Sequence, residues 1–429
     1  MEVSDALRAR LRSRDCRGRS LIPGMAVLLL AAAVTAGYPL TARADLGAAF
    51  SELTAKADDA TSAFSSPAGI VRLDRPEVVV QTSFAYTDAK FRVDDASFEG
   101  GNADHDNEVL FVPGLFYVHP LADRWRLGFS LNVPSGIGND YGKNWSGRYL
   151  AEQSSLAFVA SSAVVAWQAS DKLSLGAGPY MMYTDSKTKA RVTNLRPDAP
   201  DGSVRLEEDG VAFGYTLGAM YQFTGATRVA ASFRSSVEPT LEGTPSFSNL
   251  DPLLREVLAA ADLLGTEVDV DFKVPAIVQA GVYTELNDRW SVTGDVLWIN
   301  MSQFGITRIA IEQDSITVRE DSFRDSYMTT AGVTYQYRPD LAVSAGAMYF
   351  TSPISDGDRG IGLPLDRIFG VGAGVETPCA SFICKVNLNY FDLGDGDLAE
   401  DGGPGTGSIA GSFSKNWAVM LDFQFRRRF

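Results

Sequence analysis

The chain of 429 residues is long enough for two or three soluble domains or for one large β-barrel. Hydrophobic residues make up 45% and charged residues 21% of it, which suits a soluble protein and equally suits a barrel whose strands turn every second side chain toward a watery lumen. The formal net charge of −15 argues against nucleic acid and anionic lipid as partners, because both require basic patches.

The first 44 residues have the features of a secretion signal. Six arginines lie between positions 8 and 19, and an apolar run from Met25 to Gly37 follows that is too short to span a bilayer. Ala42-Arg43-Ala44 then offers a cleavage site. We therefore expect residues 1–44 to be removed and the mature chain to begin at Asp45. No later stretch has the roughly 18 consecutive apolar residues of a spanning helix.

Residues 45–75 show no alternation of apolar and polar side chains. The stretch from Ala48 to Ala63 is rich in Ala and Asp and predicts short helical pieces, and Ser65-Ser66-Pro67-Ala68-Gly69 follows it. We expect this segment to form a small N-terminal hatch, or plug, and not a strand of a sheet.

Residues 76–429 contain segments in which apolar and polar residues alternate, the pattern of a strand with two different faces. Trp125, Leu127 and Phe129, for example, alternate with Arg126, Gly128 and Ser130. Fourteen such segments are predicted, at 77–87, 108–118, 124–133, 155–168, 172–184, 212–224, 227–236, 272–285, 289–300, 322–337, 341–351, 366–377, 382–391 and 416–429.

The connections between these segments alternate in length. Short connections are at 119–123, 169–171, 225–226, 286–288, 338–340 and 378–381, and the long polar ones are at 88–107, 134–154, 185–211, 237–271, 301–321, 352–365 and 392–415. This asymmetry is typical of an outer-membrane barrel with tight periplasmic turns and long external loops. A soluble sandwich has no reason to sort its loops in this way.

One long connection contains a candidate amphipathic helix. Between Leu250 and Leu264 the apolar residues follow helical spacing and form one stripe that includes Leu254, Val257 and Leu258. The helix could support the mouth of the barrel, or it could be a lip on which hydrophobic molecules first adsorb. The two interpretations are compatible, and we take the three residues as candidate ligand contacts.

Two cysteines remain after the leader is removed. Cys379 and Cys384 flank a short predicted turn, where neighbouring strands can bring them within disulfide distance in an oxidising compartment. The alternative is a pair of reduced thiols without a function.

The final segment, from Asn416 to Phe429, alternates clearly and ends the chain on an aromatic residue. Such an ending resembles the closing strand of bacterial outer-membrane barrels. The sequence therefore predicts an all-β membrane protein, a 14-stranded antiparallel outer-membrane β-barrel with an N-terminal hatch. Its parts are a signal peptide (1–44), the hatch (45–75) and the barrel (76–429), which the barrel-assembly machinery inserts into outer-membrane lipid.

Several segments together resemble the FadL/TodX (OMPP1) family of outer-membrane transporters for long-chain fatty acids and other hydrophobic compounds. The similar segments are, in chain order, Ala57-Asp58-Asp59-Ala60, Ser66-Pro67-Ala68-Gly69, Asn132-Val133-Pro134-Ser135-Gly136, Trp145-Ser146-Gly147-Arg148-Tyr149, Lys172-Leu173-Ser174-Leu175-Gly176-Ala177-Gly178, Val274-Pro275-Ala276, Gly281-Val282-Tyr283, Asp295-Val296-Leu297-Trp298 and Phe323-Arg324-Asp325-Ser326. One departure is Ser66, which stands where the family has Asn.

The resemblance implies passive uptake of a hydrophobic ligand. Ligand lands among the external loops, enters an apolar pocket and leaves sideways through a gap that a kink in the third strand opens, here near 124–133, with Gly128 and Pro134 as candidate positions. The resemblance also implies that a basic residue near the end of the fifth strand meets a ligand carboxylate. Lys187, with Lys189 and Arg191 nearby, has that position.

Other functions remain as alternatives. A general porin has an open polar lumen without an N-terminal plug, and a structural or adhesive barrel works through its loops. Catalysis is not expected, because the only two histidines, His105 and His119, lie outside the middle of any predicted strand. We expect no cofactor and no metal site. Arg148 is interpreted as a residue that orders a loop through an ion pair.

Overall fold

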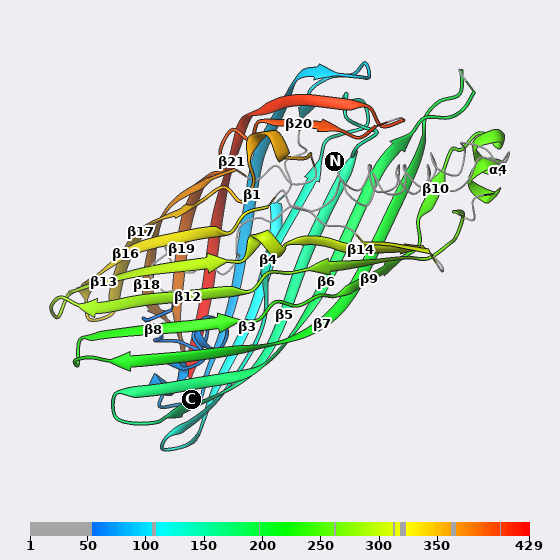
Figure 1. Cartoon of the computed structure of the whole chain (residues 1–429). Helices are drawn as coiled ribbons and strands as arrows, with labels where there is room; N and C mark the ends of the chain where they lie inside the picture. The colour runs from blue at the N-terminus through cyan, green and yellow to red at the C-terminus, as the bar shows by residue number, and fades with distance from the viewer. Residues whose placement is uncertain are drawn as a thin grey trace.

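A closed antiparallel barrel makes up most of the computed structural model, which describes residues 54–104, 109–196, 198–260, 263–311, 314–317, 323–361, 366–403 and 405–429 (Figure 1). Fourteen strands form its wall: β1 (Glu77–Ala96), β3 (Val109–Ala122), β4 (Trp125–Asp140), β5 (Gln153–Gln168), β6 (Leu173–Val192), β7 (Gly202–Gln222), β8 (Thr227–Arg234), β12 (Ile277–Glu285), β13 (Trp290–Ile299), β16 (Ser326–Arg338), β17 (Leu341–Phe350), β18 (Ile368–Cys379), β19 (Phe382–Asp392) and β21 (Ser408–Arg428). Each pairs with the next, and β21 pairs with β1 from Glu77↔Arg428 to Ala96↔Ile409. The predicted fold class and strand number are confirmed.

Smaller elements lie within the long connections, at the end of the barrel that carries them. They are β2 (Ala103–Asp104), β9 (Thr240–Gly243), β10 (Ser246–Ser248), β11 (Val268–Lys273), β14 (Gly305–Ile311), β15 (Asp314–Thr317), β20 (Leu398–Asp401), α4 (Pro252–Ala260), η3 (Met301–Gln303) and η4 (Asp356–Asp358). Two short helices, α3 (Ser62–Ser65) and η2 (Gly69–Arg72), precede the barrel. Among the described residues, no helix has the length and apolar character needed to cross a membrane.

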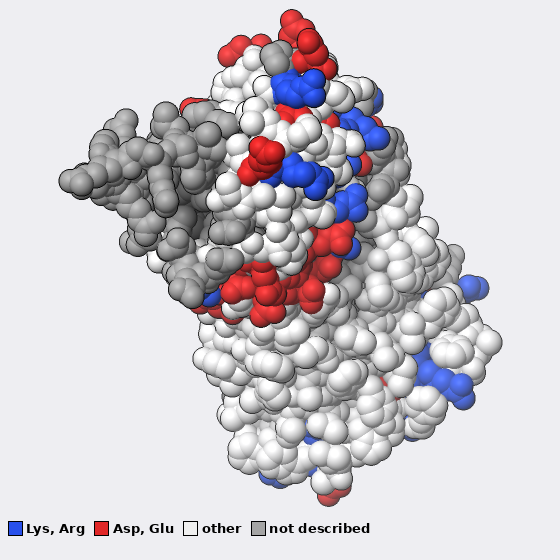
Figure 2. Space-filling model, turned by 90° about the vertical axis from the view of Figure 1, so that its right-hand side faces the viewer, with Lys and Arg blue, Asp and Glu red and all other residues white. Residues whose placement is uncertain are grey.

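Alternation along the strands sorts side chains into an outward and an inward set. On β4, Trp125, Leu127 and Phe129 are exposed on the outside, whereas Arg126 and Ser130 are buried inside. On the face that Figure 2 shows, most of the outward surface below a central acidic band is uncharged, which we call the uncharged belt, and charged side chains gather in and above that band. The belt is the surface that acyl chains cover, because large apolar side chains there, such as Phe213 with 74% exposure, are exposed on the outside of the barrel.

Several strands extend beyond their predicted ends. The strand expected at 77–87 continues to Ala96, the one expected at 172–184 continues to Val192, and the one expected at 212–224 begins at Gly202. These extensions lie on the long-loop side of the belt, where an outward side chain meets water and not lipid. The apolar face therefore disappears from the sequence, although the backbone pairing continues.

Three wall strands are interrupted on the same side of the barrel. β8, β12 and β13 stop, and β9, β11 and β14 continue the wall above them, with β11 pairing to both β9 and β14. Val237, between β8 and β9, forms an isolated β-bridge with Val274, between β11 and β12. The interruption moves the upper strands relative to the lower ones and gives inward space to large side chains such as Phe272 and Phe304, which pack edge to face.

Candidate functional site

Residues 54–75 lie inside the barrel near its short-turn end. Inward side chains of the wall bind them: the β4 side chain Arg126 donates to the Leu73 carbonyl at 2.6 Å, and the β21 side chain Gln424 donates to Asp59 Oδ2 at 2.6 Å. Further barrel side chains bind the same segment, and they are Glu77, Arg228, Ser232, Arg234, Arg426 and Arg428. The segment is thus held from opposite walls of the lumen. The N-terminal part of the predicted hatch, residues 45–53, lies outside the described residues.

The middle of this segment rests on two glycines of the wall. Gly176 and Gly218 face each other across β6 and β7, and a Cβ on Gly176 would lie 2.4 Å from the carbonyl carbon of Pro67. A Cβ on Gly218 would lie 3.0 Å from the Ala68 amide nitrogen. Sequence reasoning selected Ser66, Pro67, Ala68 and Gly69 and missed these wall glycines. The sequence could have indicated them, because the alternation of apolar and polar residues places both glycines at inward positions of their strands.

Charged groups at the start of the segment compensate one another. Asp58 pairs with Lys56 at 3.3 Å, and Arg426 donates to the Asp58 carbonyl at 3.2 Å. Burial alone would raise the pKa of the Asp58 carboxyl, but Lys56 and Arg426 hold it below its ordinary value. The carboxylate is therefore ionised and contributes to a fixed, paired arrangement.

Above this segment the lumen is filled by apolar side chains, which we call the lumenal apolar cluster. Its upper members are Leu156, Phe158, Val204, Leu206, Leu241, Leu254, Leu258, Val268, Val270, Phe272, Phe304 and Ile306. The cluster comes from the inward faces of β5, β7, β9, β11 and β14 and from α4. It is the part of the lumen in which an apolar molecule loses contact with water most completely.

The candidate helix is present and covers the rim of the barrel beside β10 (Figure 1). Leu254 and Leu258 are buried in the lumenal apolar cluster, and Val257 is half-buried. The Asp251 carboxylate caps the helix by accepting the Leu254 amide at 2.8 Å, and this bond together with other backbone amides lowers the pKa of Asp251. The Asp251 amide in turn donates to Asn194 at 2.8 Å, which ties the helix to the loop after β6.

The three predicted cations of β6 point away from the lumen. Lys187, Lys189 and Arg191 occupy outward positions, while their neighbours Thr188 and Ala190 are buried inside. Lys187 pairs with Asp185 at 3.3 Å and is half-exposed. The role of these residues as head-group ligands stays a prediction, and it requires a ligand head outside the lumenal apolar cluster.

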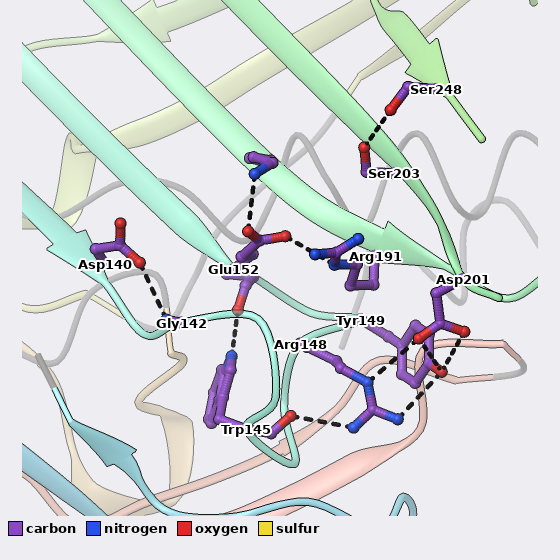
Figure 3. A network of polar contacts seen from close by, with 12 residues as sticks. Asp140, Gly142, Trp145, Arg148, Tyr149, Glu152, Arg191, Asp201, Ser203 and Ser248 are labelled. Carbon is purple, nitrogen blue, oxygen red and sulfur yellow. Dashed lines mark hydrogen bonds and ion pairs between the residues drawn. The ribbon is translucent and has the colours of Figure 1, made fainter.

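Glu152 holds the other two cations in place at the end of the loop after β4 (Figure 3). Its carboxylate accepts a hydrogen bond from Lys189 at 2.8 Å and forms an ion pair with Arg191 at 2.9 Å. On the other side of this loop, Arg148 pairs with Asp201 at 3.4 Å. Tyr149 donates to the same carboxylate at 2.9 Å. Arg148 is thus a loop-ordering residue, as the sequence predicted.

One carboxyl group faces the lumen at this level. Glu208 on β7 is 2% exposed, and its Oε1 has no hydrogen-bond partner. Ser186 donates weakly to the other oxygen at 3.5 Å, and the nearby inward hydroxyls of Ser154 and Thr184 are also buried without partners. Among the described residues of β5, β6, β7, β9 and β11, no Lys or Arg faces inward at this level.

The pairing between β3 and β4 ends partway up the wall. The two strands pair from Ala122↔Trp125 up to Gly114↔Asn132 and no further. Immediately above, β4 bulges away from β5, because Val133 and Pro134 together oppose a single β5 residue. Prolines on both sides favour this separation, since neither Pro113 of β3 nor Pro134 of β4 has an amide hydrogen to donate.

Gly128, the other candidate for the kink, is regularly paired and instead leaves space for Ala63 and Ile70.

A small cleft marks this opening. It is lined by Gln81, Val112, Pro113, Gly114, Phe116, Asn132 and Val133. Asn132 is 5% exposed, and neither its Oδ1 nor its Nδ2 has a hydrogen-bond partner. The cleft lies beside the last paired position of β3 and β4 and is lined by residues of β1, β3 and β4.

Other residues singled out in the sequence lie away from this passage. Cys379 and Cys384 form a disulfide at a short turn, with Cα atoms 5.8 Å apart. His119 contacts the Tyr117 hydroxyl at 2.9 Å on β3, and His105 lies outside the described residues. Residues 1–44, expected to be the signal peptide, also lie outside them.

The chain matches a known family over most of its length. The family model described as outer membrane protein transport protein (OMPP1/FadL/TodX) matches residues 26–429. The chain is 23% identical over 386 residues to a long-chain fatty acid transport protein of Escherichia coli O6:H1, which covers 82% of this chain and 85% of that protein. It is 24% identical over 349 residues to a 47 kDa outer membrane protein of Pasteurella multocida, covering 76% of this chain and 80% of that protein.

Solved structures share the fold. A crystal structure of a Pseudomonas aeruginosa FadL homologue superposes with a TM-score of 0.81 at 17% identity and covers 92% of this chain and all of that one. The Pseudomonas putida toluene transporter TodX superposes with a TM-score of 0.65 at 18% identity, covering 92% and 99% of the two chains.

Proposed function

The chain belongs to the OMPP1/FadL/TodX family of outer membrane transport proteins, and we propose that it takes up neutral hydrophobic small molecules by diffusion through its lumen and out between β3 and β4. It is a bacterial outer-membrane barrel that transports hydrophobic compounds, and it is not an enzyme. The loss of pairing above Gly114↔Asn132 is the observation that carries the proposed route.

Apolar burial supplies the driving force for entry. Transfer of each methylene from water into an apolar site contributes about 0.8 kcal/mol. The lumenal apolar cluster provides such a site below α4, with Leu254, Leu258 and Phe272 among its members. We propose that ligand displaces α4 from the rim and spreads these side chains apart, so no energy source is required.

The charges that line the passage favour a neutral ligand. A carboxylate that enters an apolar site must be paired with a cation, because a buried unpaired charge costs several kcal/mol. The inward ionisable group on the wall of the upper cluster is Glu208, and the three β6 cations point outward. Arg234 faces the base of the cluster, but it donates to the Phe64 carbonyl at 2.9 Å and covers the Phe64 ring.

Two described relatives carry names that mention different substrates, a long-chain fatty acid and toluene. The interior charges support the second kind of ligand here.

We further propose that residues 54–75 act as the hatch. Their contacts with β4, β6, β7 and β21 join opposite walls of the lumen, which supports a segment that obstructs the direct path from the apolar cluster to the short-turn end. Sideways exit through the gap in the wall then becomes the easier path.

The decisive variant removes the bulge. Deleting Val133 and replacing Pro134 with Thr restores one β4 residue opposite each β5 residue and supplies an amide hydrogen, so β3 and β4 can pair further. We expect cells that express this variant to take up a labelled alkylbenzene no faster than cells without the protein. Pro134→Ala alone keeps the extra residue and serves as the matched control, with uptake close to wild type.

Two other outcomes distinguish the alternatives. Unchanged uptake by the bulge-deleted variant contradicts exit through this gap. Large ohmic steps for salt in planar bilayers, without any uptake of hydrophobic compounds, favour a general porin instead. Neither uptake nor conductance favours a structural or adhesive barrel.

A further inference from the structure

We propose that Asn132 is a hydrogen-bonding site for the uncharged polar head of an amphiphilic ligand, such as a long-chain alcohol, as that ligand leaves between β3 and β4. The inference rests on the proposed function and specifies its substrate class. It concerns a single inward side chain at the last paired position before the wall opens.

The Asn132 amide is buried without partners in the described structure. It is 5% exposed, and both Oδ1 and Nδ2 lack a hydrogen bond. Buried side-chain amides are nearly always paired, and an unpaired one destabilises the fold. Such a group therefore requires an explanation beyond packing.

The neighbours of Asn132 keep the amide available. Its cross-strand neighbours are Gly114 on β3 and Ala160 on β5, and neither has a polar side-chain atom. Two residues lower on the same face, Ser130 has a different environment, because its hydroxyl lies 2.6 Å from that of Ser162. The same inward row thus contains one satisfied polar residue in the closed part of the wall and one unsatisfied residue at the opening.

The space next to Asn132 has a volume of about 10 Å³, the size of a single hydroxyl group, so the polar head fits there and the apolar tail has to lie along the lining outside it. The cleft at the opening is shared by Asn132, the β1 residue Gln81 and the apolar side chains Phe116 and Val133. Gln81 is also buried and inward-facing, so two amides lie on one cleft with apolar surface between them. An alcohol can donate its hydrogen to an amide oxygen and accept from an amide nitrogen at the same time. An alkane can do neither.

Neutral amides discriminate by hydrogen bonding and not by charge. A site built to bond a hydroxyl loses that bond with a ligand that lacks one, and the buried amide then stays unpaired. We infer that the passage favours an alcohol over the alkane of the same chain length at the exit step. A carboxylate gains no compensating cation from Asn132 or Gln81.

The test compares two ligands on one variant. Wild-type protein and Asn132→Leu are reconstituted into vesicles, and uptake of labelled hexadecanol and labelled hexadecane is measured side by side. Leucine has the same branched arrangement of side-chain heavy atoms as asparagine but no polar atom, so we expect the ratio of alcohol to alkane uptake to fall several-fold while alkane uptake persists. Asn132→Gln restores an amide and should recover part of the ratio.

Asn387→Leu is the matched control. Asn387 is an inward asparagine on β19 with 2% exposure and lies on another part of the wall, so its replacement should leave the ratio unchanged. A normal ratio in Asn132→Leu, with alkane uptake intact, overturns the inference and assigns the amide a structural role. Uptake of neither compound by the wild-type protein contradicts the proposed function instead.

A second measurement needs no variant. A hexadecanol with a photoreactive diazirine next to its hydroxyl is incubated with the wild-type protein, irradiated and mapped by mass spectrometry. We expect labelled peptides to contain residues of the cleft around Asn132 and Gln81. Labelling elsewhere in the lumen, with none at this cleft, contradicts the inference even if the leucine variant fails to assemble.

Discussion

Gly176 of β6 and Gly218 of β7 lie directly opposite each other on the inner wall, and Pro67 and Ala68 occupy the space that their missing side chains leave. The fit is tight, since a Cβ on Gly176 would lie 2.4 Å from a backbone atom of Pro67. Backbone atoms cannot move aside as the end of a flexible side chain can. The position of residues 54–75 therefore depends on two residues that are remote from them in sequence.

Gly176→Ala should displace this segment from the wall. The added methyl group overlaps the Pro67 carbonyl, so we expect the segment to shift toward the lumen and the channel to leak ions in planar bilayers, whereas we expect negligible conductance from the wild type. Gly225→Ala is the control, because a Cβ there meets no atom within 4 Å. Identical, negligible conductance in both variants contradicts the proposed seating of the hatch.

Arg228 provides a test of the hydrogen bonds that hold the segment. Its guanidinium is buried, donates to the carbonyls of Ala55 and Lys56, and lies over the Tyr283 ring at 3.9 Å. Hydrogen bonds from charged groups contribute about 1.5–3 kcal/mol each, which corresponds to roughly tenfold or more in a local opening equilibrium. We expect Arg228→Met to speed amide hydrogen exchange around Ala57 by at least that factor. Exposed Arg427→Met should not change it.

Lys187→Ala separates two accounts of acid recognition. The sequence-based assignment predicts weaker uptake of a fatty acid and unchanged uptake of a hydrocarbon. The outward, half-exposed position of Lys187 next to Asp185 leads us to expect no change in either. Competition between labelled oleate and labelled hexadecane measures the difference, and a selective loss of oleate uptake restores Lys187 as a head-group partner.

The external loops contain a carboxyl group that should make their stability depend on pH. Burial raises the pKa of Glu400 above its ordinary value. The carboxylate also accepts a hydrogen bond from the Ile361 amide at 2.7 Å, and this bond acts in the opposite direction by lowering the pKa. The folded state therefore holds the proton more tightly than the unfolded state does. Its contribution to stability is complete below the ordinary carboxyl pKa of about 4.3 and is lost as pH rises through the raised value.

Glu400→Gln removes this dependence, because the amide does not titrate. We expect chymotrypsin to cleave the wild-type loops 352–367 and 393–407 faster as pH rises from 4 to 8, after correction for the pH dependence of the protease. The variant should show a flatter profile. Parallel profiles for the two proteins contradict a titrating role for this carboxyl group.

Four outward carboxylates form a row across neighbouring strands above the uncharged belt (Figure 2). Asp185 faces Asp209, Asp209 faces Glu242, and Glu242 faces Asp269. Like charges that face each other destabilise a sheet by about 0.2–1 kcal/mol per pair. Glu242→Gln removes the charge from two of these contacts and should raise the unfolding temperature in detergent at low salt. The gain should shrink at high salt, where exposed charges are screened. An unchanged or lower temperature argues against repulsion.

Alternation alone determined much of the architecture. The outward run of Trp125, Leu127 and Phe129 identified a wall strand, and fourteen such runs gave the correct barrel. The same rule predicts the orientation of Lys187. Positions on a strand that differ by an even number share a face, and Leu175 of the same strand points outward, so Lys187 points outward too. The strands continue above the uncharged belt, but there the outward side chains are not apolar, so the sequence pattern did not reveal these extensions.

The exact register between neighbouring strands could not be read from one sequence. Pro113 and Pro134 are each visible, but only the register shows that they lie on opposite sides of the opening. Gly176 and Gly218 likewise become one platform only when β6 and β7 pair at that register. Asn132 looked like any polar inward residue until Gly114 and Ala160 were found beside it. Register depends on the closure of the whole barrel, which local propensity does not determine.

The central claim, that hydrophobic molecules pass through the lumen and leave at this opening, can be tested most directly by photolabelling. An alkylbenzene with a diazirine at the end of its tail is bound to the purified protein, irradiated, and located by mass spectrometry. We expect label on inward residues of the lumenal apolar cluster, such as Phe158 and Phe272, and on the cleft around Val133. Label confined to the outward belt, on residues such as Phe213 and Leu217, would contradict the account.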